Sequence, residues 1–104
     1  WVSILHAYTQ LMKLNPSPIL TLNWAVALAM VQGPEAGLAA LARIQDHPQL
    51  QRYYLLPATF GEFYARSERQ AEAIVAYRTA LNLTTNEAER RFLLKKIGNS
   101  IQPQ

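Results

Sequence analysis

Residues 57–86 constrain the fold most, because they place small and aromatic side chains at helical steps on two consecutive apolar segments. Gly61 stands three residues before Tyr64 in the first segment, and Ala73 stands four residues before Tyr77 in the second. Small residues let two helices approach closely, and aromatic rings fill the space beside them. The pattern predicts two helices packed together through these positions.

Three- and four-residue periodicity recurs along the rest of the chain, and no segment alternates with period two as a strand does. Groups of Gly, Pro, Ser and Asn residues separate the periodic segments and are typical of turns. The sequence therefore predicts an all-α fold of about six helices, over residues 1–14, 18–31, 35–45, 55–66, 70–83 and 86–98, followed by a frayed tail.

Each expected helix has an apolar face. Residues 18–31 are small and apolar almost all round, which predicts burial between neighbouring helices. The later helices are expected to turn these side chains inward: Leu38, Leu41, Ile44, Leu56, Phe60, Phe63, Tyr64, Ala73, Ile74, Tyr77, Ala80, Leu81, Phe92, Leu93 and Ile97.

Composition excludes several classes of protein. The chain has 104 residues, half of them hydrophobic, which suits one small globular domain over residues 1–104. No apolar run reaches the roughly 18 residues that a membrane span needs. The absence of cysteine removes disulfides and thiolate metal sites, and it fits a reducing compartment such as the cytoplasm.

The net charge of +3 comes mainly from basic residues in the second half of the chain. Acidic residues are mixed among them, and the pairs Glu62–Arg66 and Glu87–Arg91 stand four apart, as in solvated helix faces. Direct DNA binding by this chain is expected to be weak and salt-dependent, through Arg90, Arg91, Lys95 and Lys96.

The stretch QGPEAG (residues 32–37) raises the question of a phosphate loop. A P-loop needs two glycines around four residues, then Lys and Ser or Thr, after a strand, and none of this is present. A turn between two helices explains the stretch better. Gly33 is expected to take a left-handed conformation that ends one helix, and Pro34 to begin the next.

No catalytic or metal-binding constellation is visible. His6 and His47 lack a metal-ligand partner three or four residues away, and no serine has a nucleophile elbow. His47 before Pro48 is expected to be a polar residue at the end of a helix. The sequence predicts no enzyme activity, no cofactor, no metal and no small-molecule substrate.

Three places are candidate contacts with a protein partner. Trp24, beside Asn23 on an apolar helix, is either packed in the core or exposed as an anchor for a partner. Tyr53 and Tyr54 raise the same two alternatives. The third candidate is the turn formed by Gln32, Gly33 and Pro34.

The spacing of residues 57–86 resembles the tetratricopeptide repeat, a helix–turn–helix unit. Tyr8, Leu11, Leu14 and Pro16 fall at the same relative steps as Tyr77, Ala80, Leu83 and Thr85, so the first segment resembles the second half of another unit. The resemblance implies a right-handed superhelix of antiparallel helix pairs, with the last helix as a cap.

The order of short motifs along the chain is more specific than the repeat. They read LNPSP (14–18), LNxAVA (22–27), GPEAGL (33–38), YxLPA (54–58), EAxxAYRxAL (72–81) and ExERxFL (87–93). The chain resembles the C-terminal tetratricopeptide-like extension of bacterial extracytoplasmic-function sigma factors. That family usually has Asp-Gly-Pro at the turn and Arg at the place of Trp24, whereas this chain has Gln32 and tryptophan.

The resemblance implies a fragment of a longer cytoplasmic sigma factor that directs RNA polymerase to promoters. Promoter DNA would then be bound only by regions N-terminal to Trp1. The present chain would contact the sigma core, the polymerase or a regulatory protein, without a membrane role. The alternative is a tetratricopeptide-type adaptor that binds a peptide or protein partner outside transcription.

Overall fold

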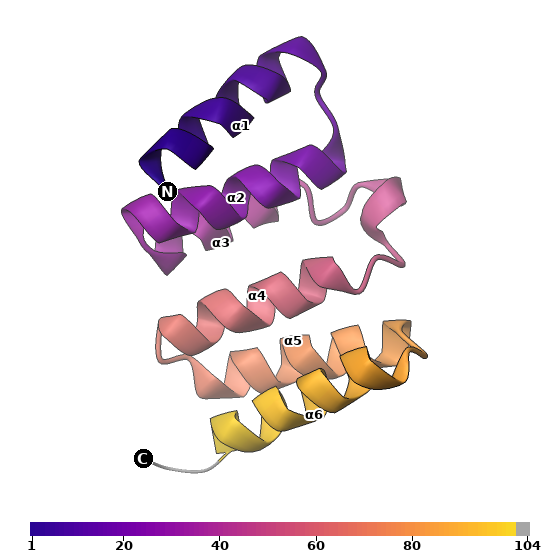
Figure 1. Ribbon diagram of the computed structural model, residues 1–104. Helices are drawn as coiled ribbons and strands as arrows, with labels where there is room; N and C mark the ends of the chain where they lie inside the picture. Colours follow the sequence, from indigo (N-terminus) through magenta and orange to yellow (C-terminus); the bar gives the residue numbers. More distant parts are fainter. Residues whose placement is uncertain (102–104) are drawn as a thin grey trace. The chain divides into compact units, whose positions relative to one another are not determined.

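The computed structural model describes residues 1–101, and throughout this range the regular structure is helical (Figure 1). The all-α prediction is therefore confirmed. The elements are α1 (Val2–Leu14), α2 (Pro18–Gln32), α3 (Pro34–Ala42), the short 3-10 helix η1 (Pro48–Leu50), α4 (Leu55–Arg66), α5 (Gln70–Leu83) and α6 (Glu87–Ile101).

The chain divides into two compact units, here called the N-terminal unit (residues 1–51) and the C-terminal unit (from residue 52). In the N-terminal unit, α2 packs against both α1 and α3. In the C-terminal unit, α5 packs against both α4 and α6. Helices adjacent in sequence are thus adjacent in space within each unit, as in tetratricopeptide-like folds.

A capping residue begins α2 where the sequence predicts it. The Ser17 hydroxyl oxygen accepts a hydrogen bond from the Leu20 amide at 3.4 Å, and Pro18 occupies the first helical position. The Nδ1 atom of His47 accepts a hydrogen bond from the Gln49 amide at 3.2 Å and so starts η1. His47 was expected at the end of the preceding helix, but α3 ends at Ala42 and His47 instead caps the start of η1.

The burial predicted for the apolar helix α2 is confirmed only in part, because Ile19, Met30 and Val31 are 43%, 38% and 39% exposed. The small side chains of α2 allow close packing against its neighbours. The buried side chains of the N-terminal unit are Leu22, Ala25, Ala27, Ala29, Leu38, Ala40, Leu41 and Leu50, and Ile44 is half-buried.

The core of the C-terminal unit is built around the Tyr77 ring, which is 1% exposed. A Cβ atom placed at Gly61 of α4 would lie 2.7 Å from two atoms of this ring, so only glycine allows the observed approach. Leu56 and Phe63 are also buried, and Phe60 and Tyr64 are half-buried and stack at 6.0 Å. The remaining buried residues of this core are Ala58, Ala73, Ala80, Leu93 and Ile97.

Two helix ends differ from the predicted ones by three residues. Helix α3 ends at Ala42 instead of residue 45, because the amides of Arg43 and Ile44 bond to carbonyls three residues back and tighten into turns. Helix α6 continues to Ile101, so the expected fraying at residues 99–101 is wrong. The expected fraying of residues 102–104 lies outside the described residues.

The expected burial of Phe92 is also wrong, since its side chain is 54% exposed. Leu93 and Ile97 stand four residues apart on α6 and form the buried stripe, and Phe92 lies one residue off this stripe. The Lys96 ammonium lies 5.5 Å from the centre of the Phe92 ring, a cation–π contact at the surface.

Across residues 1–101, none of the helices combines the length and the apolar character that crossing a bilayer requires.

Candidate interaction site

Trp24 lies on α2, and its side chain is neither fully buried nor fully exposed. Its indole Nε1 donates a hydrogen bond to the Thr9 hydroxyl oxygen at 3.1 Å, and that hydroxyl donates to the Leu5 carbonyl at 2.8 Å. The side chain is half-buried. The polar edge of the indole is therefore used to join α2 to α1, and only part of the ring surface is accessible.

The turn of Gln32, Gly33 and Pro34 joins α2 to α3. Gly33 has φ 98° and ψ 164°, a backbone region that is essentially restricted to glycine. The expected positive φ is present, but ψ is extended instead of helical. Its amide donates to the Ala29 carbonyl at 2.8 Å, which ends α2, and Pro34 begins α3. Gln32 is exposed, whereas Gly33 and Pro34 are half-buried.

Replacing Gly33 by alanine is expected to destabilise the chain by about 1–2 kcal/mol, because a Cβ atom is strained at positive φ. A Cβ atom here would meet no other atom within 4 Å, so the effect comes from the backbone alone. Urea denaturation measures it. Gln32→Ala, at the neighbouring exposed position, is the control and is expected to change stability by less than about 0.5 kcal/mol. Equal effects of the two substitutions would contradict the strained turn.

Tyr53 and Tyr54 precede α4 in the C-terminal unit, and both are half-buried. The Tyr53 carbonyl accepts from the Leu56 amide and the Tyr54 carbonyl from the Ala58 amide, each at 3.1 Å. Tyr54 packs against the core of this unit. Its burial is the larger cause, and the negative charge of the Glu89 carboxylate the smaller one, of a raised pKa of its phenol. Tyr54 is thus partly structural.

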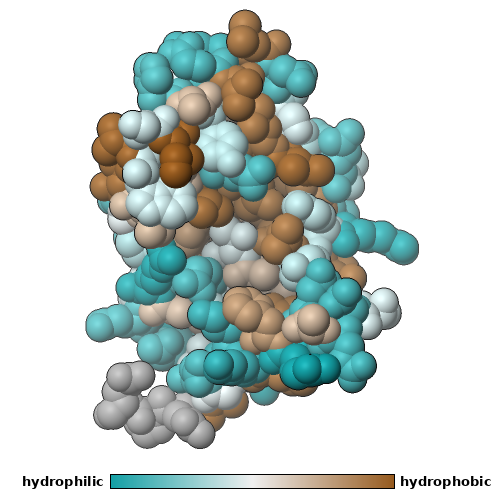
Figure 2. Space-filling view, viewed as in Figure 1, coloured by the Kyte–Doolittle hydropathy of each residue, from teal (hydrophilic) through white to brown (hydrophobic). Residues whose placement is uncertain are grey.

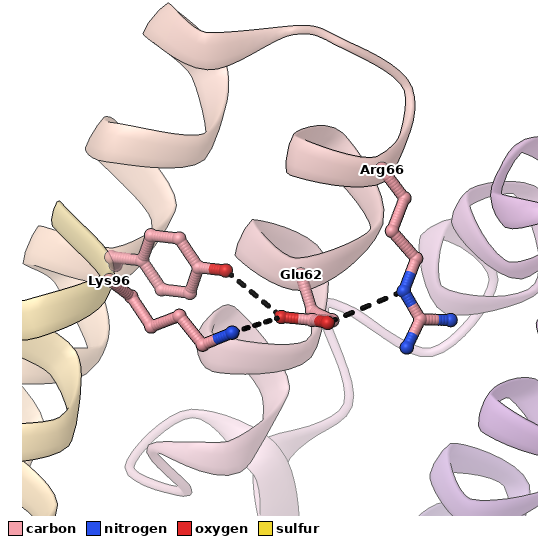
Figure 3. A network of polar contacts seen from close by, with 4 residues as sticks. Glu62, Arg66 and Lys96 are labelled. Atoms are coloured by element: carbon pink, nitrogen blue, oxygen red, sulfur yellow. Dashed lines mark hydrogen bonds and ion pairs between the residues drawn. The ribbon is translucent and has the colours of Figure 1, made fainter. Parts of the chain in front are cut away.

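A polar network that the sequence predicts only in part surrounds Glu62 of α4. Figure 3 shows the Glu62 carboxylate between Arg66 on one side and Lys96 on the other. Its Oε1 lies 3.3 Å from Arg66 Nε, and its Oε2 lies 3.4 Å from Lys96 Nζ. The Tyr77 hydroxyl donates to Oε2 at 3.2 Å. The Glu62–Arg66 pair is confirmed; its spacing of four residues was the signal.

The contacts of Glu62 with Tyr77 and Lys96 had no signal in the sequence, because they depend on how α5 and α6 pack against α4. A hollow of about 230 Å³ lies beside the network, lined by side chains of α4, α5 and α6. One carboxylate faces two cations there, and the ion pairs are about one third exposed. Such pairs contribute at most about 1 kcal/mol each.

Burial, the negative charge of Glu62 and the hydrogen bond to it raise the pKa of Tyr77 well above its ordinary value of 10.0, with Arg66 acting in the opposite direction. The folded chain therefore keeps this phenol protonated at a pH where the unfolded chain ionises it. The contribution to stability is fully present below about pH 10 and is lost as the pH rises further.

The unfolding midpoint is therefore expected to fall more steeply between pH 9 and 11 in the natural chain than in Tyr77→Phe. The slope contributed by one such group reaches about 1.4 kcal/mol per pH unit. Thermal unfolding followed by circular dichroism at several pH values measures it. Tyr64→Phe, which removes a phenol outside this network, is the control. Parallel profiles for the natural chain and Tyr77→Phe would contradict the coupling.

A second hollow, of about 380 Å³, is lined by residues of the α5–α6 link and α6, among them Arg90 and Arg91. Arg90 donates from one guanidinium nitrogen to the Leu81 carbonyl at 2.9 Å and to the Thr84 carbonyl at 3.1 Å, which caps the end of α5. Two of the four basic side chains considered for DNA contact, Arg90 and Lys96, are thus used in contacts within the C-terminal unit.

The candidate contacts fall in both units. Trp24, Gln32, Gly33 and Pro34 belong to the N-terminal unit, and Tyr53 and Tyr54 to the C-terminal unit. Trp24 and Gln32 lie on α2, whereas Gly33 follows the end of α2 and Pro34 begins α3. Within residues 1–101, the structure assembles no group of three or more His, Asp or Glu side chains suited to a metal ion.

Comparison with known proteins identifies an uncharacterized bacterial relative. The chain is 34% identical over 99 residues to an uncharacterized protein of Rhizobium meliloti (strain 1021). The aligned region covers 95% of this chain but only 23% of that protein, so the chain spans less than a quarter of its relative's length. No protein-family model and no solved structure matches the chain.

Proposed function

We propose that this chain is a protein-interaction and regulatory module in the C-terminal region of an extracytoplasmic-function sigma factor. The observation that carries the proposal is the ordered set of six motifs between residues 14 and 93. The paired-helix fold of both units supports it, because stacked helix pairs commonly present protein-binding surfaces. The partner is the sigma core, RNA polymerase or a regulatory protein in the cytoplasm.

The turn at the end of α2 is the proposed contact. Gln32 is exposed, and its backbone neighbour Gly33 holds a conformation that few other residues adopt. Because this chain has glutamine where the sigma-factor family has an acid, the contact relies on backbone shape and amide hydrogen bonds instead of a carboxylate. Promoter DNA is bound by other regions of the parent protein, and the module itself takes no cofactor or small-molecule substrate.

The test uses the tagged full-length protein that the gene encodes, mixed with purified RNA polymerase core enzyme. We expect co-purification with the core, and a roughly tenfold weaker association for Gln32→Arg, equivalent to about 1.4 kcal/mol. Gln10→Arg is the matched control, because Gln10 is also an exposed helical glutamine of the N-terminal unit. This control is expected to bind as the natural protein does.

Two outcomes would overturn the proposal. One is a full-length protein without a sigma core and helix-turn-helix. The other is the absence of any association with polymerase. Recovery of a different partner whose binding is lost in Gln32→Arg would favour the adaptor function instead and would keep the turn as the contact.

A further inference from the structure

Helix α1 is apolar, yet none of its residues is buried. Ile4, Leu11 and Leu14 are 45%, 48% and 84% exposed. In Figure 2 hydrophobic side chains gather on the face where Figure 1 draws α1 and α2. Scattered apolar residues on a surface are ordinary, but a whole helix with this composition and no buried residue indicates a missing neighbour.

The internal similarity of the chain allows α1 to be compared with α5. The pair α1–α2 corresponds to the pair α5–α6: each is joined by a three-residue link, and the second helix has 15 residues in both. Tyr8 and Tyr77 take equivalent places, because each stands ten residues before the first residue of the helix that follows, Pro18 or Glu87. Ile4 then corresponds to Ala73, and Leu11 to Ala80.

Equivalent positions differ sharply in burial. Ala73, Tyr77 and Ala80 of α5 are 0%, 1% and 0% exposed. Their counterparts on α1 are the exposed Ile4, the half-buried Tyr8 and the exposed Leu11. Both α1 and α5 have a following helix, but α5 also has α4, which brings Gly61 against the Tyr77 ring. The difference in burial between α1 and α5 is therefore explained by α4, the helix that precedes α5.

We propose that a further helix of the same polypeptide lies before α1, runs antiparallel to it and covers Ile4, Tyr8 and Leu11. By analogy with α4 it has about 12 residues and an apolar face. Gly61 stands 16 residues before Tyr77. A glycine, alanine or serine is accordingly expected about 16 positions before Tyr8, outside the 104 residues. The Rhizobium relative extends beyond the aligned region, which makes up 23% of its length.

The first test is the gene's own coding sequence upstream of Trp1. The proposal requires an amphipathic helical segment that ends a few residues before Val2, with a small residue about 16 positions before Tyr8. The absence of such a segment would overturn it. This requirement is independent of the proposed function, because a sigma factor and an adaptor could equally well carry the helix.

The second test compares Leu11→Glu with Gln10→Glu in the gene-encoded protein. Gln10 is exposed and corresponds to the exposed Thr79 of α5, so it is the matched control. We expect Leu11→Glu to lower the thermal midpoint by about 5 °C or more, because it buries a charge, and Gln10→Glu to change it by less than about 1 °C. Replacing the small upstream residue by leucine should lower the midpoint similarly.

Sedimentation distinguishes the proposed helix from a second copy of the chain. The proposal expects the midpoint and the molecular mass to be independent of protein concentration. A dimer that Leu11→Glu dissociates would overturn it, since the face would then be occupied by a second copy. Equal small effects of Leu11→Glu and Gln10→Glu would also overturn it, because the face would then be open to solvent.

Discussion

Tyr77→Ala is expected to cost about 3–5 kcal/mol of unfolding free energy, the largest effect of any substitution considered for this chain. The ring is 1% exposed, contacts Gly61 and lies in the core of the C-terminal unit. Truncation removes the buried ring and leaves a cavity that the surrounding helices fill only in part. Because whole domains are stable by only about 5–15 kcal/mol, this unit is expected to unfold at low urea concentration.

Tyr77→Phe separates the ring from its hydroxyl group. It keeps the packing and removes only the hydrogen bond to Glu62, which Arg66 and Lys96 still contact. The expected loss is about 1 kcal/mol, because Glu62 stays partly hydrated. Urea denaturation of both variants measures the difference. A phenylalanine variant as unstable as the alanine variant would show that the polar network, and not the ring, supports the unit.

Most helix boundaries could be predicted because local chemistry sets them. Ser17 and Pro18 start α2, and Gly33 and Pro34 separate α2 from α3, each through a backbone requirement that the residue type itself expresses. The end of α3 could not be predicted in the same way. No glycine marks it, and the turns after Ala42 result from competing hydrogen bonds.

Burial could be predicted where small and aromatic residues are paired, as for Gly61 and Tyr77. The prediction of burial was wrong for Phe92. Periodicity alone is compatible with burial of either of two neighbouring faces of α6, and the face that packs in the core is the one with Leu93 and Ile97. Sequence spacing identifies residues that share one helix face, but not contacts between helices. The ion pair Glu62–Arg66 could therefore be predicted from the sequence, whereas the Lys96–Glu62 ion pair and the Trp24–Thr9 hydrogen bond could not.

The candidate contacts depend on different signals. The turn at Gly33 could be located because glycine before proline is a local turn signal, and the structure adds the extended ψ. The alternatives for Trp24 could not be decided from the sequence, because a tryptophan on an apolar helix suits a core and a surface equally well. In the structure Trp24 donates a hydrogen bond to Thr9 and is half-buried, so it is neither a fully buried core residue nor a fully exposed anchor.

Gly61→Ala and Gly98→Ala are expected to change stability in opposite directions. Both glycines lie in helices, where alanine is intrinsically better by about 0.8–1 kcal/mol. At Gly98 a Cβ atom would meet nothing within 4 Å, so this gain should appear in full. At Gly61 it would lie 2.7 Å from the buried Tyr77 ring, and forcing α4 and α5 apart costs about 1–3 kcal/mol.

Urea denaturation of the two single variants and of Gly61→Ala combined with Tyr77→Leu tests the origin of that cost. Leucine has no ring to clash with the new methyl group, so adding Gly61→Ala to Tyr77→Leu should cost less than adding it to the natural chain. This non-additivity is expected because the two residues are in direct contact. A penalty of the same size in both backgrounds would mean that Gly61 is required for some reason other than the approach of the Tyr77 ring.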